Sequence, residues 1–253
     1  MICYVDMEHR RAFQSAKERA AHHVYVLDVT RRLEETSGDR CKVRRYDSVT
    51  TDWLDTVDAR ALVVSGNVTD WVAYDEANLR ELYQIVRSAS LPILGLCGGL
   101  QLIAMAHGTP VGPIQDLKEQ EIDPNQDCGP GYLKEWGFKT VQVTQPDPLF
   151  AGMERPTFLE AHFLEVKAVP DGFRWLASTE LCRIQVLKKI GEMVYGTQFH
   201  PEAYIAAPSD CRHWLVELVY PTGYAGGMQP AGRQLLINFF RLAGVLSQPE
   251  VRP

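Results

Sequence analysis

A cysteine placed between glycines is the residue of this chain best suited to covalent chemistry. Residues 92–102 read PILGLCGGLQL, in which a short apolar run ends at Cys97 and a helix-like apolar pattern follows. The spacing is that of a nucleophile elbow, G-x-nucleophile-x-G, with cysteine in the place of serine. Side chains at the flanking glycines would clash where the strand end packs against the helix start. A helix N-terminus also favours a thiolate, which makes Cys97 a candidate nucleophile.

A histidine and a glutamate further along the chain supply a base and a group to orient it. Residues 195–202 read YGTQFHPE, so a strand would deliver His200 at its carboxyl end, where a proline ends the strand. An adjacent base raises the thiolate fraction of a thiol, and a carboxylate such as Glu202 holds the imidazole in one tautomer. Taken alone, Cys97 would more often be a buried, unreactive cysteine. Together the three residues predict a nucleophile, a base and an orienting carboxylate.

Strand-like and helix-like segments alternate through the first half of the chain, which is typical of β-α-β units and a parallel sheet. Ligands of such sheets bind at the carboxyl ends of the strands, where Cys97 and the pair Ser65-Gly66 both fall. The expected strands are residues 2–6, 42–46, 61–64 and 93–96, and the expected helices are residues 24–35, 75–87 and 98–106.

The second half of the chain has the pattern of antiparallel hairpins. Residues 110–135 form a proline- and glycine-rich loop that is long enough to cover a site. No repeat or linker divides the sequence. We therefore predict a single α/β domain over residues 1–253, with a mostly parallel central sheet flanked by helices and an antiparallel section in the second half. The further strands expected are residues 139–143, 163–169, 183–187 and 193–199, followed by a helix at residues 233–242.

Composition and charge exclude several classes of protein. The 253 residues are 45% hydrophobic and 23% charged, with a net charge of −6, and this acidic excess argues against a nucleic-acid partner. No stretch approaches the roughly 18 apolar residues that span a bilayer, and the N-terminus turns polar at once, unlike a signal peptide. The six cysteines are scattered without C-x-x-C pairs, which favours reduced thiols. We expect a cytoplasmic protein with no metal, cofactor or membrane contact.

The segments around Cys97 and His200 resemble the class I, or triad-type, glutamine amidotransferases. The family's elbow reads roughly G-[IVL]-C-x-G-x-Q, which residues 95–101 match, and residues 195–202 match every fixed position of its Y-G-x-Q-F-H-P-E signature. Weaker likenesses to the family's EYG, DPLFxGL and SHxDEV segments lie between them. The order is most similar to the amidotransferase domain of GMP synthetase-like proteins. The resemblance implies the flavodoxin-like class I amidotransferase fold.

The resemblance also implies an activity, that of a cysteine-dependent glutamine amidohydrolase. Cys97 would attack the side-chain amide of glutamine, His200 would take the thiol proton and later protonate the leaving ammonia, and Glu202 would orient His200. The γ-glutamyl thioester would then be hydrolysed to glutamate. The ammonia would pass to a separate synthetase partner, since the sequence shows no synthetase domain and no ATP-binding glycine loop.

The surroundings of the nucleophile follow from the same resemblance. Backbone N–H groups at Gly66 and Gly98 would form the oxyanion hole. Gln101, one turn into the helix, would help to bind glutamine, and His162 and Phe163 would line the pocket. His162 fits a structural role equally well, and that alternative stays open.

The chain departs from the family in three places. Residues 65–68 read SGNV where the family usually has Gly-Gly-Pro, although Asn67 tolerates unusual backbone angles. Residues 114–133 and 203–232 are longer than the corresponding segments of the family. They could be surface loops, a docking surface or parts of an altered substrate pocket. Two other functions therefore stay open: a stand-alone γ-glutamyl amide hydrolase or transferase, and a non-catalytic regulatory protein with the same fold.

Overall fold

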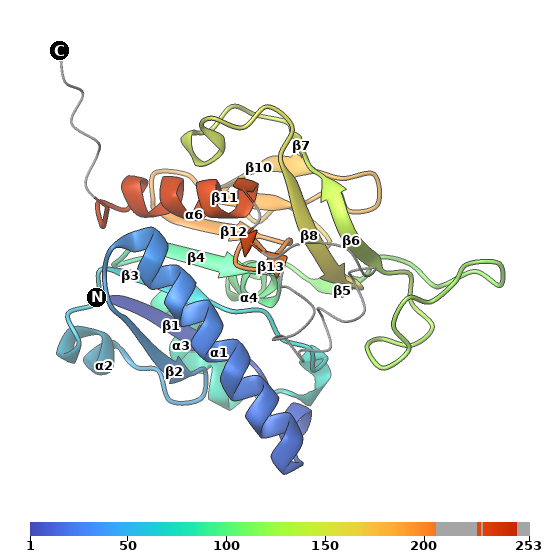
Figure 1. Ribbon diagram of the computed structural model, residues 1–253, viewed down its shortest axis with the longest axis horizontal. Helices are drawn as coiled ribbons and strands as arrows, with labels where there is room; N and C mark the ends of the chain where they lie inside the picture. Colours follow the sequence, from blue (N-terminus) through green and yellow to red (C-terminus); the bar gives the residue numbers. More distant parts are fainter. Residues whose placement is uncertain (206–226, 229, 247–253) are drawn as a thin grey trace.

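An eight-stranded sheet forms the centre of the computed structural model, which describes residues 1–205, 227–228 and 230–246 (Figure 1). Its strand order is β2-β1-β3-β4-β12-β11-β10-β7. These strands are β1 (Ile2–Asp6), β2 (Cys41–Arg45), β3 (Ala61–Val64), β4 (Ile93–Leu96), β7 (Gln142–Val143), β10 (Phe173–Ser178), β11 (Val186–Lys189) and β12 (Val194–Thr197). The α-helices are α1 (Ala16–Ser37), α2 (Thr51–Thr56), α3 (Glu76–Ser88), α4 (Gly98–Ala106) and α6 (Pro230–Leu242).

Five strands of the sheet, β2, β1, β3, β4 and β12, run parallel to one another. The first four come from the first half of the chain, whereas β12 comes from near its end and pairs directly with β4. Parallel strands have their carboxyl ends at one edge of the sheet. The fold thus brings the residues that follow β3, β4 and β12 to the same edge.

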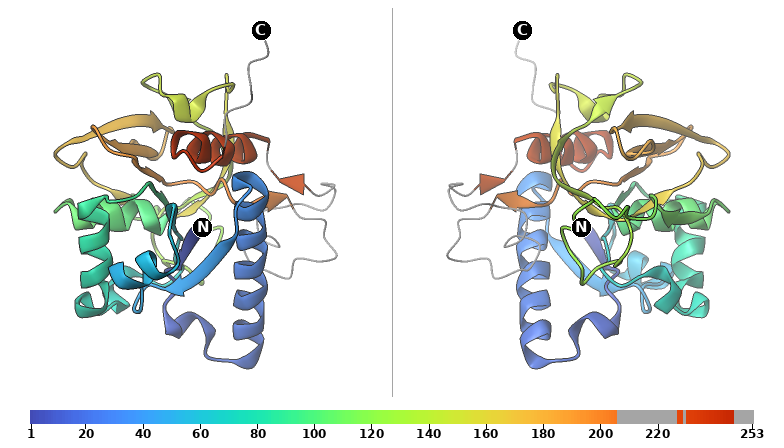
Figure 2. Two further views of the ribbon diagram at one scale, coloured as in Figure 1. Left: turned by 90° about the vertical axis from the view of Figure 1, so that its left-hand side faces the viewer. Right: turned by 90° about the vertical axis from the view of Figure 1, so that its right-hand side faces the viewer.

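Both faces of the parallel strands are covered by helices (Figure 2). Side chains of a strand alternate between the two faces, so Cys3 and Val5 of β1 join the core that contains α3 and α4. Ile2 and Tyr4 join the core that contains α1 and α6. Burial on both faces explains why β1 and β3 read as continuous apolar runs without polar alternation.

Helix α1 begins and ends at clear local signals. Ser15 caps its N-terminus by accepting from the backbone N–H of Glu18, while the Glu18 side chain accepts from the backbone N–H of Ser15. Gly38 ends the helix in the left-handed conformation with φ 68°. The helix is therefore fixed at both ends, and its chain runs back along the sheet from the edge where the parallel strands end (Figure 1).

The second half of the chain adds antiparallel structure. Strands β11, β10 and β7 continue the central sheet in antiparallel fashion. Separate two-stranded ribbons pair β6 (Glu135–Thr140) with β8 (Thr157–His162), β5 (Val111–Pro113) with β9 (Leu164–Val166), and β13 (Tyr204–Ile205) with β14 (Gly227–Met228). A bridge between Leu159 and His200 ties the β6–β8 ribbon to the end of β12.

The predicted α/β fold with a mostly parallel sheet and an antiparallel section is confirmed. Strands 61–64 and 93–96 and helix 98–106 have the predicted bounds. The single strand predicted at 139–143 was wrong, because the chain leaves the β6–β8 ribbon at Thr140 and joins the central sheet as β7. The strand predicted from 163 was also wrong, since Phe163 lies at the bend between β8 and β9.

Most of the enlarged segment predicted at 203–232 lies outside the described residues, apart from its ends in β13, β14 and the start of α6. In the described part of the chain, no helix is both long and apolar enough to cross a membrane.

Candidate active site

Cys97 occupies a strained turn between β4 and α4. Its backbone has φ 49° and ψ −104°, a region that residues with a side chain rarely adopt. A Cβ on Gly95 would lie 2.5 Å from the carbonyl of Gly99, and a Cβ on Gly99 would lie 2.3 Å from the carbonyl oxygen of Val64. Both contacts are too short for any Cβ. The predicted need for glycine on both sides of the cysteine is therefore confirmed.

Three neighbouring strands bring Gly66, Cys97 and His200 together. These residues follow β3, β4 and β12, whose registers pair Val64 with Gly95 and Leu96 with Thr197. A Cβ on Gly66 would lie 3.2 Å from both Cys97 Cβ and His200 Cε1. The backbone of Gly66 thus packs directly against the two predicted catalytic residues, where a methyl group would press on both.

The structure also brings His200 and Glu202 together. His200 Nδ1 lies 2.8 Å from Glu202 Oε1, and both side chains are buried. The other ring nitrogen, Nε2, is not engaged by Glu202, and Cys97 lies close enough to influence the charge of the ring. Burial opposes a charge on the imidazole, but the negative charges of Glu202 and Cys97 outweigh it and raise the pKa of His200 well above its ordinary value. The surroundings of His200 therefore favour its imidazolium form.

Helix α1 holds the glutamate in place, which sequence reasoning missed. The Tyr25 hydroxyl donates to Glu202 Oε1 at 3.4 Å, and Arg32 Nη1 donates to the backbone carbonyl of Glu202 at 2.5 Å. Arg32 is only 5% exposed, so it is not part of a solvated helix face. No local signal identifies either residue, because their contacts span about two thirds of the chain.

A chain of amide side chains fixes the sulfur of Cys97 from the other side. Trp71 Nε1 donates to Gln101 Oε1 at 2.7 Å, Gln101 Nε2 donates to Gln198 Oε1 at 3.3 Å, and Gln198 Nε2 donates to Cys97 Sγ at 3.5 Å. Gln101 Nε2 also donates to the carbonyl of Leu164 at 3.1 Å. Both ends of the Gln101 amide are therefore engaged by protein groups. Gln198 was not selected from the sequence, although it is a fixed position of the YGTQFHPE match.

The loop after β3 is held by a buried carboxylate, Glu8, at the end of β1. Glu8 accepts from the backbone N–H of Val68 at 2.7 Å, from the backbone N–H of Thr69 at 3.3 Å and from the Thr69 hydroxyl at 2.8 Å. Among the described residues, the N–H groups of Gly66 and Asn67 have no such acceptor. They are therefore free to donate from a loop whose Gly66 backbone packs against Cys97.

A narrow pocket opens in front of the cysteine. Phe163 forms part of its wall and is itself covered by the 114–133 segment, since Tyr132 stacks on its ring at 5.8 Å and a Cβ on Gly129 would lie 2.5 Å from it. The predicted loop therefore lies against the site. The pocket is lined by Asn67, Val68, Thr69, Asp70, Cys97, Gln101, Cys128, Ala161, His162, Phe163 and Leu164.

The covering segment is tied down by Lys134, whose side chain is almost fully buried. Its Nζ lies 2.6 Å from Asp123 Oδ1 and donates to the carbonyls of Gly129 and Tyr132 at 3.0 and 3.3 Å. The segment also brings Cys128 into the pocket wall, where burial raises the pKa of this thiol to about 12. Cys128 is therefore a neutral thiol at neutral pH and a poor second nucleophile.

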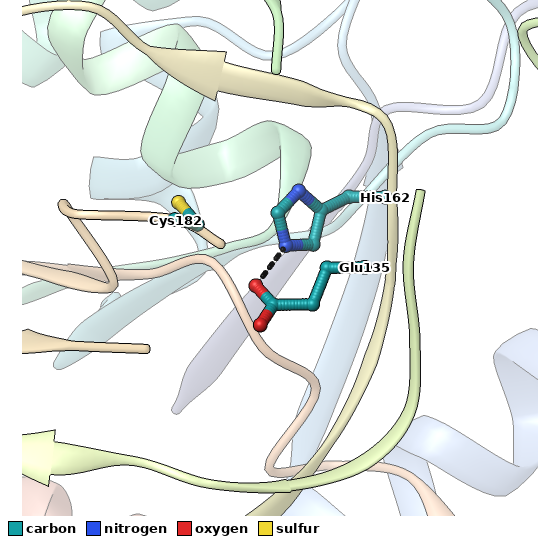
Figure 3. Close-up of side chains that lie close together, drawn as sticks. All are labelled: Glu135, His162 and Cys182. Atoms are coloured by element: carbon teal, nitrogen blue, oxygen red, sulfur yellow. Dashed lines mark hydrogen bonds and ion pairs between the residues drawn. The ribbon is translucent and has the colours of Figure 1, made fainter. Parts of the chain in front are cut away.

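His162 belongs both to the pocket wall and to a buried ion network (Figure 3). Its Nε2 lies 3.2 Å from Glu135 Oε2 and 3.3 Å from Glu160 Oε2, and its Nδ1 lies 2.9 Å from the carbonyl of Leu164. A carbonyl only accepts, so Nδ1 carries a hydrogen. Burial opposes the charge, but the two carboxylates outweigh it and raise the pKa of His162 to about 10. His162 therefore lines the pocket and also has a structural role in the ion network, so both alternatives left open for it apply.

The described residues include one group that could hold a metal ion, Glu135, His162 and Cys182, with ligand atoms within 4.8 Å of one another (Figure 3). The nitrogen that would bind the metal already faces two carboxylates, and Gln185 Nε2 donates to Glu135 Oε2 at 2.8 Å. Burial raises the pKa of Cys182 well above its ordinary value, so its sulfur is a neutral thiol. His162 is thus already ion-paired with both carboxylates and the neighbouring thiol is neutral, and the absence of a metal stays a prediction.

The network predicts a pH dependence of stability. A histidine whose pKa rises from about 6.5 to about 10 on folding stabilises the fold fully below pH 6.5 and loses this contribution as the pH rises through 10. Between these values the free energy of unfolding should fall more steeply in the wild type than in His162→Gln, by up to about 1.4 kcal/mol per pH unit. Urea unfolding at a series of pH values measures the two slopes.

The matched control is His107→Gln, because burial lowers the pKa of His107 below its ordinary value. The contribution of His107 to the free energy of unfolding is therefore lost as the pH falls, not as it rises. His107→Gln should consequently keep the alkaline slope of the wild type. Equal alkaline slopes in the wild type and in His162→Gln would contradict the charged state assigned to His162.

Comparison with known proteins identifies the family. The fold and the elbow define an α/β protein with a cysteine at the carboxyl edge of its parallel strands. The family model described as Glutamine amidotransferase class-I matches residues 22–210, and the chain belongs to this family. Its members are glutamine amidotransferases and amidohydrolases, so the chain is an enzyme of this class.

Curated relatives are GMP synthases. The sequence is 33% identical over 129 residues to a glutamine-hydrolyzing GMP synthase subunit of Methanocaldococcus jannaschii, covering 51% of this chain and 60% of the relative. It is 30% identical over 183 residues to the glutamine-hydrolyzing GMP synthase of Vesicomyosocius okutanii, covering 70% of this chain. The match spans only 31% of that longer relative.

Solved structures share the fold. A putative GMP synthase subunit from Thermoplasma acidophilum has a TM-score of 0.66 at 23% identity, with 96% of this chain and 94% of that chain covered. A glutamine amido transferase from Methylobacillus flagellatus has a TM-score of 0.62 at 15% identity, with 98% and 96% covered.

Proposed function

We propose that this chain hydrolyses glutamine by covalent catalysis at Cys97 and supplies the ammonia to a separate synthetase. The observation that carries the proposal is the grouping of Cys97, His200 and Glu202 at a strained elbow that opens into the pocket, with Glu202 hydrogen-bonded to His200 and the Gly66 backbone packed against both Cys97 and His200. Family membership supports glutamine as the substrate.

In the first half of the reaction the Cys97 thiolate attacks the carboxamide carbon of glutamine. The carbonyl oxygen becomes an oxyanion, which the N–H groups of Gly98 and of the Gly66 loop would stabilise, since the first turn of a helix leaves its N–H groups without partners. His200 then gives its Nε2 proton to the nitrogen. The C–N bond breaks, ammonia leaves, and a γ-glutamyl thioester remains on Cys97.

In the second half a water molecule attacks the thioester carbon while His200 takes the water proton at Nε2. The C–S bond breaks, glutamate leaves, and the pair of thiolate and imidazolium is restored. Glu202 accepts the Nδ1 hydrogen throughout, which holds the ring in one orientation and stabilises its positive charge.

The use of the ammonia by a partner rests on the relatives. Two proteins named as glutamine-hydrolyzing subunits of GMP synthase are 33% and 30% identical to this chain over 129 and 148 residues. The longer GMP synthase from Vesicomyosocius okutanii extends well beyond the third of its length that this chain matches. We therefore propose that a synthetase protein receives the ammonia from this chain.

The direct test is ammonia and glutamate release from glutamine by the purified protein, alone and with the synthetase component of a GMP synthase. We expect Cys97-dependent hydrolysis in at least one of the two conditions. Release equal to that of Cys97→Ala in both conditions would overturn the proposal. A strong preference for bulky γ-glutamyl amides over glutamine would instead favour the stand-alone hydrolase.

The anchoring of the loop after β3 gives a further prediction. Glu8→Gln keeps the size of the side chain but replaces one accepting oxygen by an N–H₂ group, so at least one bond to Val68 or Thr69 is lost. Hydrogen bonds to charged groups contribute about 1.5–3 kcal/mol. We expect kcat for glutamine hydrolysis to fall by roughly 10- to 100-fold, because the backbone N–H groups of this loop would no longer be held in position to stabilise the oxyanion.

The control for this prediction is Glu180→Gln, a substitution at an exposed glutamate that is not among the residues lining the pocket. It should keep the kcat of the wild type. A wild-type kcat in Glu8→Gln would show that the carboxylate does not position the loop.

A further inference from the structure

The side chain of Asn67 occupies the space that a side chain at position 98 would need, so Gly98 leaves room for it. The family usually has a glycine where this chain has Asn67, and its elbow motif leaves open the position where this chain has Gly98. A Cβ on Gly98 would lie 1.7 Å from Asn67 Oδ1 and 2.9 Å from Asn67 Cγ. The Asn67 carboxamide thus fills the space of a side chain at position 98. In this conformation, Asn67 and any side chain at position 98 exclude each other.

The orientation of the Asn67 carboxamide is fixed. Its Nδ2 donates to the carbonyl of Thr69 at 2.7 Å, and that carbonyl can only accept. The loop on both sides of this bond is held by Glu8. Oδ1 is consequently turned toward Gly98, where it is buried and has no hydrogen-bond partner in the described part of the chain. A buried acceptor without a donor is unfavourable, and a ligand that donates an N–H or O–H group to this oxygen would remove that cost.

The position of this oxygen identifies the group that would pair with it. Asn67 and Cys97 line the same pocket, and Gly98 directly follows Cys97. Glutamine has two donors, the carboxamide N–H₂ and the α-ammonium. The carboxamide nitrogen is bonded to the carbon that Cys97 attacks, whereas three further carbons separate that carbon from the ammonium. We infer that Asn67 Oδ1 accepts a hydrogen bond from the scissile carboxamide of the substrate.

This contact would act on the chemical step, and the inference rests on the proposed function. As the C–N bond breaks, the nitrogen takes the proton of His200 and becomes more positive. A hydrogen bond from that nitrogen to Asn67 Oδ1 strengthens during the step, so it lowers the barrier more than it tightens binding. An ester substrate has no N–H at this position and gains nothing from the contact.

The experiment compares glutamine with glutamate γ-methyl ester in the wild type and in Asn67→Gly, which restores the residue usual in the family. We expect the ratio of kcat/KM for the amide to kcat/KM for the ester to fall about tenfold, which corresponds to about 1.4 kcal/mol. The loss should lie mainly in kcat for glutamine. Asn78→Ala, at an exposed position of α3, is the matched control and should keep the ratio.

A second variant tests the contact without changing Asn67. Gly98→Ala keeps the backbone N–H but displaces the Asn67 carboxamide, so the ratio should fall in the wild-type background and should not fall further in Asn67→Gly. An unchanged ratio in Asn67→Gly, or fully additive losses in the double variant, would overturn the inference. If the wild type hydrolyses neither substrate, the proposed function itself fails, and the two failures are thus distinguishable.

Discussion

Replacing Cys97 by alanine is expected to lower the rate of glutamine hydrolysis by about 10⁴-fold or more, to the level of the background reaction. Removal of the nucleophile of a comparable hydrolase costs about 10⁶ in kcat, because the remaining groups act only through it. The substitution removes one sulfur atom from a buried position and keeps the Cβ, so the fold should survive. Glutamate release under saturating glutamine measures the loss.

Cys41→Ala is the matched control for this loss, because Cys41 lies on the edge strand β2 and is neither in the pocket nor near His200. It should keep the activity of the wild type. Residual hydrolysis by Cys97→Ala within tenfold of the wild type would contradict covalent catalysis at this residue, provided that both variants unfold at similar urea concentrations.

Replacing Glu202 by glutamine is expected to lower kcat by about 10²–10⁴-fold while the fold is preserved. In a serine hydrolase, the corresponding change of the orienting carboxylate to an amide costs about 10⁴. Here the carboxylate lies 2.8 Å from His200 Nδ1 and is one of the charges that raise the pKa of His200. An amide keeps the volume but neither the charge nor a guaranteed acceptor at that nitrogen.

The pH dependence gives this prediction a second readout. Because Glu202 raises the pKa of His200, the wild type keeps its imidazolium to a higher pH than an ordinary histidine would. In Glu202→Gln the imidazolium should be lost at lower pH, so the alkaline limb of the kcat/KM profile should move toward neutrality. A low rate with an unmoved alkaline limb would show that Glu202 acts through the fold rather than through the charge of His200.

Local patterns were sufficient to predict the elbow. Apolar runs set the bounds of β3 and β4, and two glycines with a cysteine between them require the tight turn that the structure contains. His200 and Glu202 were predicted because their spacing along one strand end is short. The pairing of β4 with β12 was not predicted, since no local signal pairs strands that lie about 100 residues apart.

The supporting residues could not be predicted because their roles depend on tertiary contacts. Glu8 and Tyr25 contact the site across more than 50 residues of sequence, and neither has a local pattern that marks it. In the sequence Arg32 resembles part of a charged helix face, but in the structure its side chain is buried and donates to the carbonyl of Glu202. The division of the 139–143 and 163–169 segments also depends on tertiary structure, because each bends from one sheet to another.

Trapping of the covalent intermediate distinguishes covalent catalysis at Cys97 from every route that forms no thioester. The wild type is mixed with glutamine, quenched in acid within one turnover, digested and analysed by mass spectrometry, with Cys128 as an internal comparison in the same pocket. We expect a γ-glutamyl thioester on the peptide that carries Cys97, absent without glutamine and absent from the Cys128 peptide. The same trapping is done in Glu202→Gln. Steady turnover without an adduct on Cys97 in either protein would contradict covalent catalysis at this residue, and so would an adduct on Cys128 in its place.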